Sequence, residues 1–225
     1  MGSKKDLKDR TFLNKFGSYE AMDFVITNYY ILALSGELGH FKNNNDQKIE
    51  KLVRSWSKNI KNLIKKNEAP LWGWKDPSTI YTIPYIHEYL TNPHYICLKR
   101  NINDIVDSIL RVVKNLSNIQ SILHLSFRYL DFKTFLKLIW NYFIEFVKKG
   151  SKNKFINYLN KRIIEVYNKI NSFVMDKKHL CLNLDDLIKN SPVVIKNITN
   201  FLEINPSDKQ ISDALSFIHP EIIHY

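Results

Sequence analysis

Glycine and cysteine are both scarce in this chain of 225 residues, which contains six glycines and two cysteines. The glycines stand at positions 2, 17, 36, 39, 73 and 150, and none belongs to a glycine-rich loop of the kind that wraps around phosphates. The two cysteines, Cys97 and Cys181, fall in apolar runs, where cysteine behaves as a small buried hydrophobic residue. They predict neither a disulfide framework nor a metal site, and they indicate a reducing compartment.

Long apolar stretches are also lacking. The longest, residues 24–34, is interrupted by Thr27 and Asn28 and is shorter than the roughly 20 residues that a membrane span needs. Residues 4–10 are rich in charge, unlike a secretory signal, and the histidines show no metal-ligand spacing. We therefore expect a soluble, cytoplasmic protein without a membrane span and without a metal.

The composition predicts one globular domain over residues 1–225, because 44% of the residues are hydrophobic and 13% are aromatic. The formal net charge is +11, from 33 Lys and Arg against 22 Asp and Glu. We interpret this excess as a solvated lysine-rich surface, and it leaves open that the charge steers an anionic ligand or a nucleic acid. Nucleic acid is not the expected partner, because the basic and aromatic residues show no pattern typical of base stacking.

The apolar pattern predicts a mostly helical chain with three strands. The strands are expected at 71–75, 94–99 and 179–184, and the main helices at 18–37, 46–66, 82–90, 103–113, 191–202 and 207–217, with further helical material at 116–175. Helices separate the strands, and no two-residue hairpin joins them, which indicates parallel pairing. We therefore expect an α/β fold of three α/β/α layers around a parallel sheet.

Two of the expected strands end in a cation. Lys75 ends the first and precedes Asp76, whereas Arg100 follows the second, and Ser108 comes eight residues later inside the next helix. Ligands of parallel sheets bind at the carboxyl ends of the strands, where helix amino ends favour phosphate. Arg100 and Ser108 could therefore hold one phosphate between them. The simpler alternative is a surface arginine and an exposed helical serine.

This part of the chain resembles a known family. The runs WGWKDPSTIYTIPYIHEYL and HYICLKRNINDIVDSI resemble the central part of the sulfotransferases that use 3′-phosphoadenosine 5′-phosphosulfate, especially their bacterial-type branch. NKFGSYEAMDF is similar to an N-x-x-G-x-x-E stretch of that family, and HLCLNLDDLIKNSPVVIKNITNFLEI and HPEIIHY resemble its carboxyl-terminal part. The resemblance covers most of the chain except residues 116–155.

The resemblance implies a P-loop-NTPase-like sulfotransferase fold, with the phosphosulfate nucleotide as donor and adenosine 3′,5′-bisphosphate as product. Arg100 and Ser108 would bind the 3′-phosphate, Lys75 would face the transferred sulfonate, and Glu20 would be the base that takes a proton from a hydroxyl or amine acceptor. The acceptor, a carbohydrate or small metabolite, is not identified by any motif. Ordinary alternatives remain for Lys75, as a strand-end lysine beside Asp76, and for Glu20, as a glutamate favoured by a helix amino end. Asp76 is interpreted as a cap.

The sequence departs from the family pattern in two places. The family begins with a strand and a G-x-P-R-S-G-T loop that holds the 5′-phosphosulfate, and no such loop occurs here. Ser78 stands where the family often has arginine. The resemblance therefore implies a chain that is shortened at its amino end, or one completed by another chain, with a homo-oligomer left open. The alternatives are a catalytically inactive nucleotide-binding remnant or subunit, and a basic helical nucleic-acid-binding protein.

Overall fold

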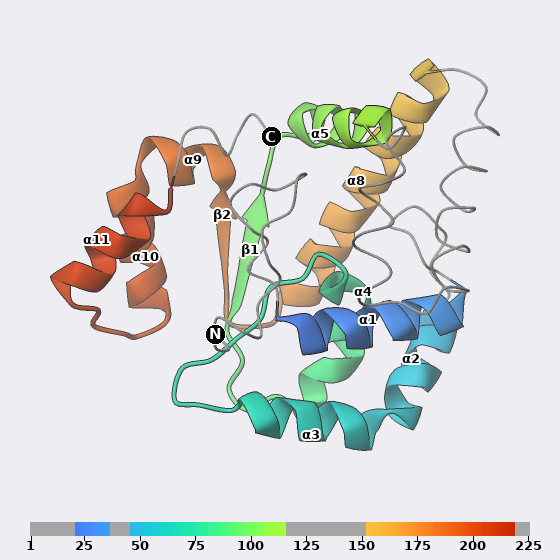
Figure 1. Cartoon of the computed structure of the whole chain (residues 1–225), viewed down its shortest axis with the longest axis horizontal. Coiled ribbons are helices and arrows are strands. Elements are labelled where there is room, and N and C mark those ends of the chain that lie inside the picture. The colour runs from blue at the N-terminus through green and yellow to red at the C-terminus, as the bar shows by residue number, and fades with distance from the viewer. Residues whose placement is uncertain (1–20, 37–45, 116–151, 219–225) are drawn as a thin grey trace. The chain divides into compact units, whose positions relative to one another are not determined.

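The computed structural model of the chain describes residues 21–36, 46–115 and 152–218 (Figure 1). The chain divides into two compact units, one of Met1–Thr91 with Asn115–Arg162 and one of Asn92–Lys114 with Ile163–Tyr225. The described residues are mostly helical and include a two-stranded parallel sheet, in agreement with an α/β chain that is rich in helix. None of the described helices is long and apolar enough to cross a membrane.

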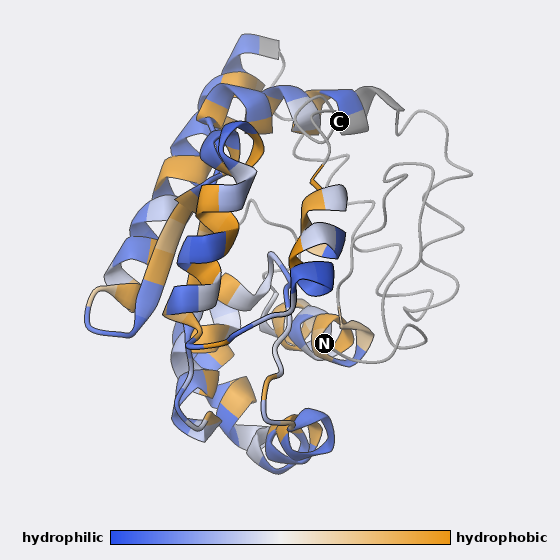
Figure 2. Ribbon diagram, turned by 90° about the vertical axis from the view of Figure 1, so that its left-hand side faces the viewer, coloured by the Kyte–Doolittle hydropathy of each residue, from blue (hydrophilic) through white to orange (hydrophobic). Residues whose placement is uncertain are grey.

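The described part of the first unit is helical. Its elements are α1 (Met22–Ser35), α2 (Asp46–Ser55), α3 (Ser57–Asn67), α4 (Thr79–Ile86), the 3-10 helix η2 (His87–Tyr89) and the beginning of α8 (Lys152–Val174), which continues into the second unit. The core includes Ile31, Ile49, Val53 and Ile60, whose side chains are all at most 1% exposed. Apolar bands alternate with polar bands along the helices, as expected for helices that are covered on one side (Figure 2).

The helix expected at 46–66 is interrupted at Trp56, so that α2 and α3 are separate helices. The Trp56 N–H bonds to the carbonyl oxygens of both Leu52 and Val53, at 3.0 and 3.2 Å, which tightens the backbone there. The indole of Trp56 contacts the ring of Tyr30, with 6.3 Å between centroids. The apolar side chains of Ile49, Val53, Ile60 and Ile64 are all buried, as expected for helices that are covered on one side.

The strand expected at 71–75 is wrong. This segment is a loop, and in the part of the chain that the structure describes it pairs with no strand. Trp72 and Trp74 of this segment both stack on Phe24 of α1, with centroid distances of 6.1 and 4.3 Å. Stacking of aromatic rings therefore holds residues 71–75 in place, without backbone hydrogen bonds to a neighbouring strand.

The helix start expected at Thr82 is also wrong, since α4 begins at Thr79 and contains Pro84. The turn before it is closed by two bonds to Asp76, from Ser78 N to Oδ1 at 3.0 Å and from Thr79 N to the carbonyl oxygen at 3.0 Å. Thr82 caps nothing, because its side chain is fully buried and bonds to Asn28. Asp76 therefore closes the turn before α4 and is not its cap, since the N-cap position is Ser78, which makes no side-chain capping bond.

The second unit contains the sheet. Its elements are β1 (Tyr95–Lys99), α5 (Ile102–Asn115), the end of α8, β2 (His179–Asn183), α9 (Leu184–Lys189), α10 (Ser191–Phe201) and α11 (Asp208–Ser216). β1 and β2 are parallel, with Tyr95 opposite His179 and Lys99 opposite Asn183. The two later expected strands and their parallel direction are confirmed. Ser207 also caps α11 as expected, through a capping box with Gln210.

Several apolar side chains of the two strands are exposed to solvent. On β1, Ile96 and Leu98 are 43% and 51% exposed. The end of α8 lies against the opposite face of β1, where the Tyr95 ring meets the Phe173 ring edge-on at 5.1 Å between centroids. Cys97 is half-buried on this face, but Cys181 on β2 is exposed, so the expectation of two buried cysteines is wrong for Cys181. The described contact of α8 with this face, between Phe173 and Tyr95, is made on β1, the strand that carries Cys97.

Some expected features lie outside the described residues. They are the helix start at Ser18, the candidate base Glu20, the helical region 116–151 and the segment HPEIIHY.

Candidate functional site

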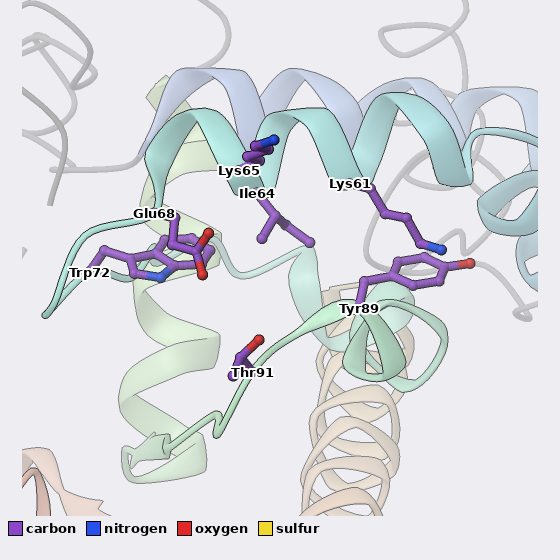
Figure 3. Close-up of a pocket in the computed structure, with 7 residues that line it drawn as sticks. All are labelled: Lys61, Ile64, Lys65, Glu68, Trp72, Tyr89 and Thr91. Carbon is purple, nitrogen blue, oxygen red and sulfur yellow. The ribbon is translucent and has the colours of Figure 1, made fainter.

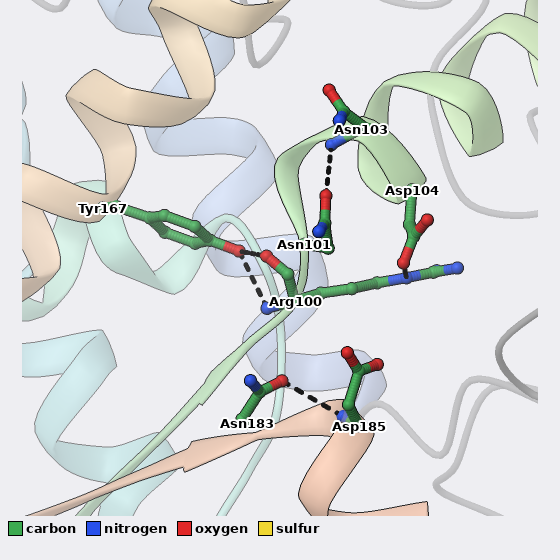
Figure 4. Close-up of polar contacts among 7 residues, drawn as sticks. All are labelled: Arg100, Asn101, Asn103, Asp104, Tyr167, Asn183 and Asp185. Atoms are coloured by element: carbon green, nitrogen blue, oxygen red, sulfur yellow. Dashed lines mark hydrogen bonds and ion pairs between the residues drawn. The ribbon is translucent and has the colours of Figure 1, made fainter.

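Arg100 directly follows β1, and its backbone is held by one side chain. The hydroxyl of Tyr167, in the second half of α8, accepts a hydrogen bond from Arg100 N–H at 2.9 Å and donates one to the Arg100 carbonyl oxygen at 2.7 Å (Figure 4). A single hydroxyl therefore satisfies both backbone polar groups of Arg100, the residue that follows the strand. The position of Arg100 is set by a residue distant in the sequence.

The start of α5 comes directly after Arg100. The Asn101 side-chain oxygen accepts a hydrogen bond from Asn103 N–H at 2.9 Å, and the Asn101 carbonyl accepts one from Ile105 N–H at 3.2 Å. These bonds make Asn101 the cap of the helix. The first turn of α5 therefore faces the same edge of the sheet as Arg100, and an exposed helix amino end carries partial positive charge.

The Arg100 side chain runs past Asp104 on the first turn of α5 (Figure 4). Arg100 Nε lies 4.0 Å from Asp104 Oδ2, and the arginine side chain is 17% exposed. This separation exceeds the roughly 2.7 to 2.9 Å of a direct charge-assisted hydrogen bond, so the ion pair is loose. Ser108 stands four residues after Asp104, one helical turn further on the same side of α5.

The end of β2 adds further polar groups to this edge. The Asn183 side-chain oxygen accepts a hydrogen bond from Asp185 N–H at 3.1 Å and thereby caps α9 (Figure 4). Lys99, opposite Asn183 in the sheet, donates to the side-chain oxygen of Asn171 on α8 at 2.9 Å. Because the strands are parallel, both carboxyl ends meet here, and Lys99 and Arg100 make the β1 side cationic.

Lys75 belongs to the first unit and is exposed beside a buried polar cluster. Asn28 of α1 is the centre of this cluster: its amide donates to Asp76 Oδ2 at 2.7 Å and to Thr79 Oγ1 at 2.9 Å. Its side-chain oxygen accepts a bond from the Thr82 hydroxyl at 2.7 Å. Asn28 and Asp76 are 2% and 8% exposed. Asp76, the residue that follows Lys75, is therefore fixed from inside the unit.

The same cluster reaches the residue before Lys75. The Trp74 indole N–H donates to Thr79 Oγ1 at 2.9 Å, so Thr79 receives hydrogen bonds from two side chains. Ser78 is only 3% exposed, and its backbone N–H belongs to the Asp76 turn. Ser78 is thus part of the buried turn.

A small pocket lies elsewhere in the first unit. It has a volume of about 190 Å³ and is lined by Lys61, Ile64, Lys65, Glu68, Trp72, Tyr89 and Thr91 (Figure 3). Lys61 Nζ lies 4.7 Å from the centre of the Tyr89 ring, a cation–π contact that forms one end of the pocket. Ligand pockets usually enclose about 300 to 1,000 Å³, so this one is too small for a nucleotide.

The predicted site residues therefore fall into separate parts of the molecule. Arg100 precedes α5 and Ser108 lies within it, both in the second unit, whereas Lys75 belongs to the first unit. Among the described residues there is no group of three or more His, Cys, Asp or Glu that could hold a metal ion.

Two important residues are not among the predicted site residues. Tyr167 holds Arg100, and nothing in the helical pattern around it marks it, because its partner is 67 positions away. Asn28 had a weak signal, a polar side chain inside the apolar run of residues 24–34. Buried amides need hydrogen-bond partners, so such a residue indicates an internal polar cluster.

No family model matches the chain, and neither a curated protein nor a solved structure does.

Proposed function

We propose that the protein is a sulfotransferase that moves a sulfonate group from 3′-phosphoadenosine 5′-phosphosulfate to a hydroxyl or amine of a carbohydrate or small metabolite. The observation that supports this most is the arrangement of Arg100 at the end of β1, with its backbone bonded to Tyr167 and the capped start of α5 directly after it. Ser108 follows on the same side of that helix. A guanidinium fork, a hydroxyl and a helix amino end are the groups that bind a phosphate monoester.

In this proposal each residue has a defined role. Arg100 and Ser108 bind the 3′-phosphate of the donor, and Lys75 stabilises the negative charge that develops on the leaving phosphate oxygen. Glu20 accepts the proton of the acceptor as its oxygen or nitrogen attacks sulfur in line. The two described strands would belong to a three-layer, P-loop-NTPase-like sulfotransferase sheet.

A second candidate is a protein that binds the nucleotide without transferring sulfonate, alone or as a subunit. It is favoured by one feature of the sequence, since no G-x-P-R-S-G-T loop occurs in these 225 residues. A third candidate, a basic helical nucleic-acid-binding protein, depends only on the net charge of +11.

Calorimetry with adenosine 3′,5′-bisphosphate tests the binding site. Arg100→Ala should weaken binding by about tenfold to 150-fold, because a charge-assisted contact contributes roughly 1.5 to 3 kcal/mol. Arg54→Ala removes the same charge from an exposed position of α2 and is the matched control, expected to change affinity less than about threefold. Adenosine 5′-monophosphate, which lacks the 3′-phosphate, should bind as weakly as the bisphosphate binds to Arg100→Ala. Equal affinity for the two nucleotides would show the phosphate assignment to be wrong.

A transfer assay separates the candidates. The protein is incubated with the labelled donor and a panel of sugars and amines, and both the labelled product and adenosine 3′,5′-bisphosphate are measured. The sulfotransferase proposal is supported if wild type forms the labelled product and Lys75→Ala does not, although the variant still binds the nucleotide. Binding without product supports the second candidate. Oligonucleotide binding that falls steeply with salt, without any response to the bisphosphate, supports the third.

A further inference from the structure

Two cysteines from distant parts of the chain occupy opposite positions in the parallel sheet. Cys97 on β1 is the register partner of Cys181 on β2. Neighbouring strands lie about 4.8 Å apart, and register partners project to the same face of the sheet. This spacing lies within the Cα separation of about 4.4 to 6.8 Å that a disulfide spans. Both cysteines are free thiols.

The two thiols differ in their access to solvent. Cys181 is exposed, whereas Cys97 is half-buried on the face of β1 that carries Tyr95 and Lys99. These neighbours meet α8, through the contact of Tyr95 with Phe173 and the hydrogen bond from Lys99 to an asparagine. Burial, followed by the contact with Cys181, raises the pKa of Cys97 to about 11, so this thiol stays protonated at neutral pH. A dissolved oxidant therefore meets Cys181 first.

We propose that Cys97 and Cys181 form a redox-active dithiol in which Cys181 is oxidised first and Cys97 then closes a disulfide between β1 and β2. A hydroperoxide transfers one oxygen to the Cys181 sulfur, giving a sulfenic acid, and is reduced to the alcohol or, for hydrogen peroxide, to water. The Cys97 sulfur then attacks the sulfenic sulfur. The S–S bond forms as the S–O bond breaks, and water leaves with the Cys97 proton.

The position of Cys97 opposite Cys181 favours rapid formation of the disulfide. Fixed register partners react intramolecularly, and such proximity compensates for the low thiolate fraction of Cys97. The same spacing allows both sulfurs to bind one thiophilic atom, such as the trivalent arsenic of phenylarsine oxide. The disulfide would join the strands just before Arg100 and Asn183. It uses no residue of the proposed phosphate site, so the two proposals stand or fall separately.

Peroxide treatment of the full chain tests the proposal directly. After a small excess of hydrogen peroxide and blocking of remaining thiols, the titratable thiols should fall from two to none per chain and return after reduction. Trypsin releases the cysteines on separate peptides, 76–99 and 179–189. Without reduction these peptides should appear joined, with a mass about 2 Da below their sum because two hydrogens are lost. Two thiols that survive, or peptides joined only between different chains, would overturn the proposal.

Two variants test the order of the steps. Cys97→Ser should stop the reaction at the Cys181 sulfenic acid, which dimedone captures. Cys181→Ser should slow the oxidation of the remaining thiol by about tenfold or more, because that thiol is half-buried and protonated. Dimedone capture at Cys97 in the wild-type chain would contradict the order. Phenylarsine oxide gives a readout that needs no variant: one equivalent should remove both titratable thiols, and the loss of only one would contradict a dithiol.

Discussion

Two short segments of this protein have the same local design and different surroundings. In each, a cation precedes a residue whose side-chain oxygen accepts the N–H two positions later, from Ser78 to Asp76 in one and from Asn103 to Asn101 in the other. A helix starts directly after each turn. The first turn lies over a buried polar cluster in a loop, whereas the second follows a paired strand. The same type of turn is therefore bonded to buried side chains in the first unit and lies at the polar edge of the sheet in the second.

The difference shows how each cation is positioned. The Lys75 segment depends on side chains that satisfy one another inside the unit, with Asn28 at the centre. The Arg100 segment depends on the sheet and on one hydroxyl that bonds to the backbone. We therefore expect substitutions in the Lys75 segment to lower the stability of the fold. Substitutions in the Arg100 segment should instead reduce local order and ligand affinity.

The largest effect is expected from Asn28→Ala. The substitution leaves buried Asp76 and Thr82 without their amide partner, and each unsatisfied buried group costs about 1 to 3 kcal/mol. The free energy of unfolding should fall by about 3 kcal/mol or more, measured by urea denaturation followed by tryptophan fluorescence. Thr27→Ala, the neighbouring change on α1, removes only an exposed bond to the Asp23 carbonyl and should cost less than about 0.5 kcal/mol. Equal losses would show that the Asn28 cluster is not an anchor.

The second effect tests the Arg100 segment. Tyr167→Phe removes two hydrogen bonds to the Arg100 backbone and should lower stability by about 1 to 2 kcal/mol. If the proposed phosphate site is correct, the affinity for adenosine 3′,5′-bisphosphate should also fall by about threefold to tenfold, because Arg100 loses its fixed position. Tyr30→Phe is the control, since Tyr30 contacts Trp56 through its ring. A stability loss without any change in affinity would separate Tyr167 from the ligand site.

A smaller effect comes from alkaline pH. Burial raises the pKa of Tyr95 from 10 to about 12, so between these values the folded state holds a proton that the unfolded state has lost. The stability that depends on this proton is present below pH 10 and is lost as pH rises towards 12. After allowance for solvent screening of a half-buried group, we expect a contribution of about 1 kcal/mol. Urea unfolding at pH 9 and pH 11.5 should therefore show a smaller loss for Tyr95→Phe than for wild type, and an identical loss would contradict this assignment.

The smallest effect is expected at the surface of the first unit. Lys66 Nζ lies 2.8 Å from Asp23 Oδ2, but the two side chains are 71% and 49% exposed. Lys66→Ala should change the free energy of unfolding by at most about 0.5 kcal/mol, and less in high salt, because water and ions screen exposed pairs. If Lys66→Ala lowered the free energy of unfolding as much as Asn28→Ala does, the buried cluster would contribute no more to stability than a surface ion pair.

Reasoning from the sequence succeeded where local pattern dominates. The runs around Cys97 and Cys181 are apolar and β-branched or leucine-rich, and both became strands with the expected parallel direction. The cap at Ser207 also followed local rules. The same reasoning failed at residues 71–75, because alternating tryptophans look the same whether they lie on a strand or stack on another aromatic ring.

The sequence by itself determined the helix-rich α/β character, the two parallel strands and the spacing from Arg100 to Ser108, because these follow from the order of apolar and polar residues. Only the tertiary structure decided that Asn28 holds Asp76, that Tyr167 holds Arg100 and that Cys97 faces Cys181. Each of these pairs joins residues that are distant along the chain, and local pattern carries no information on which distant group meets a buried donor or thiol. That choice is made by packing, which leaves a buried polar group only the partners that lie within reach.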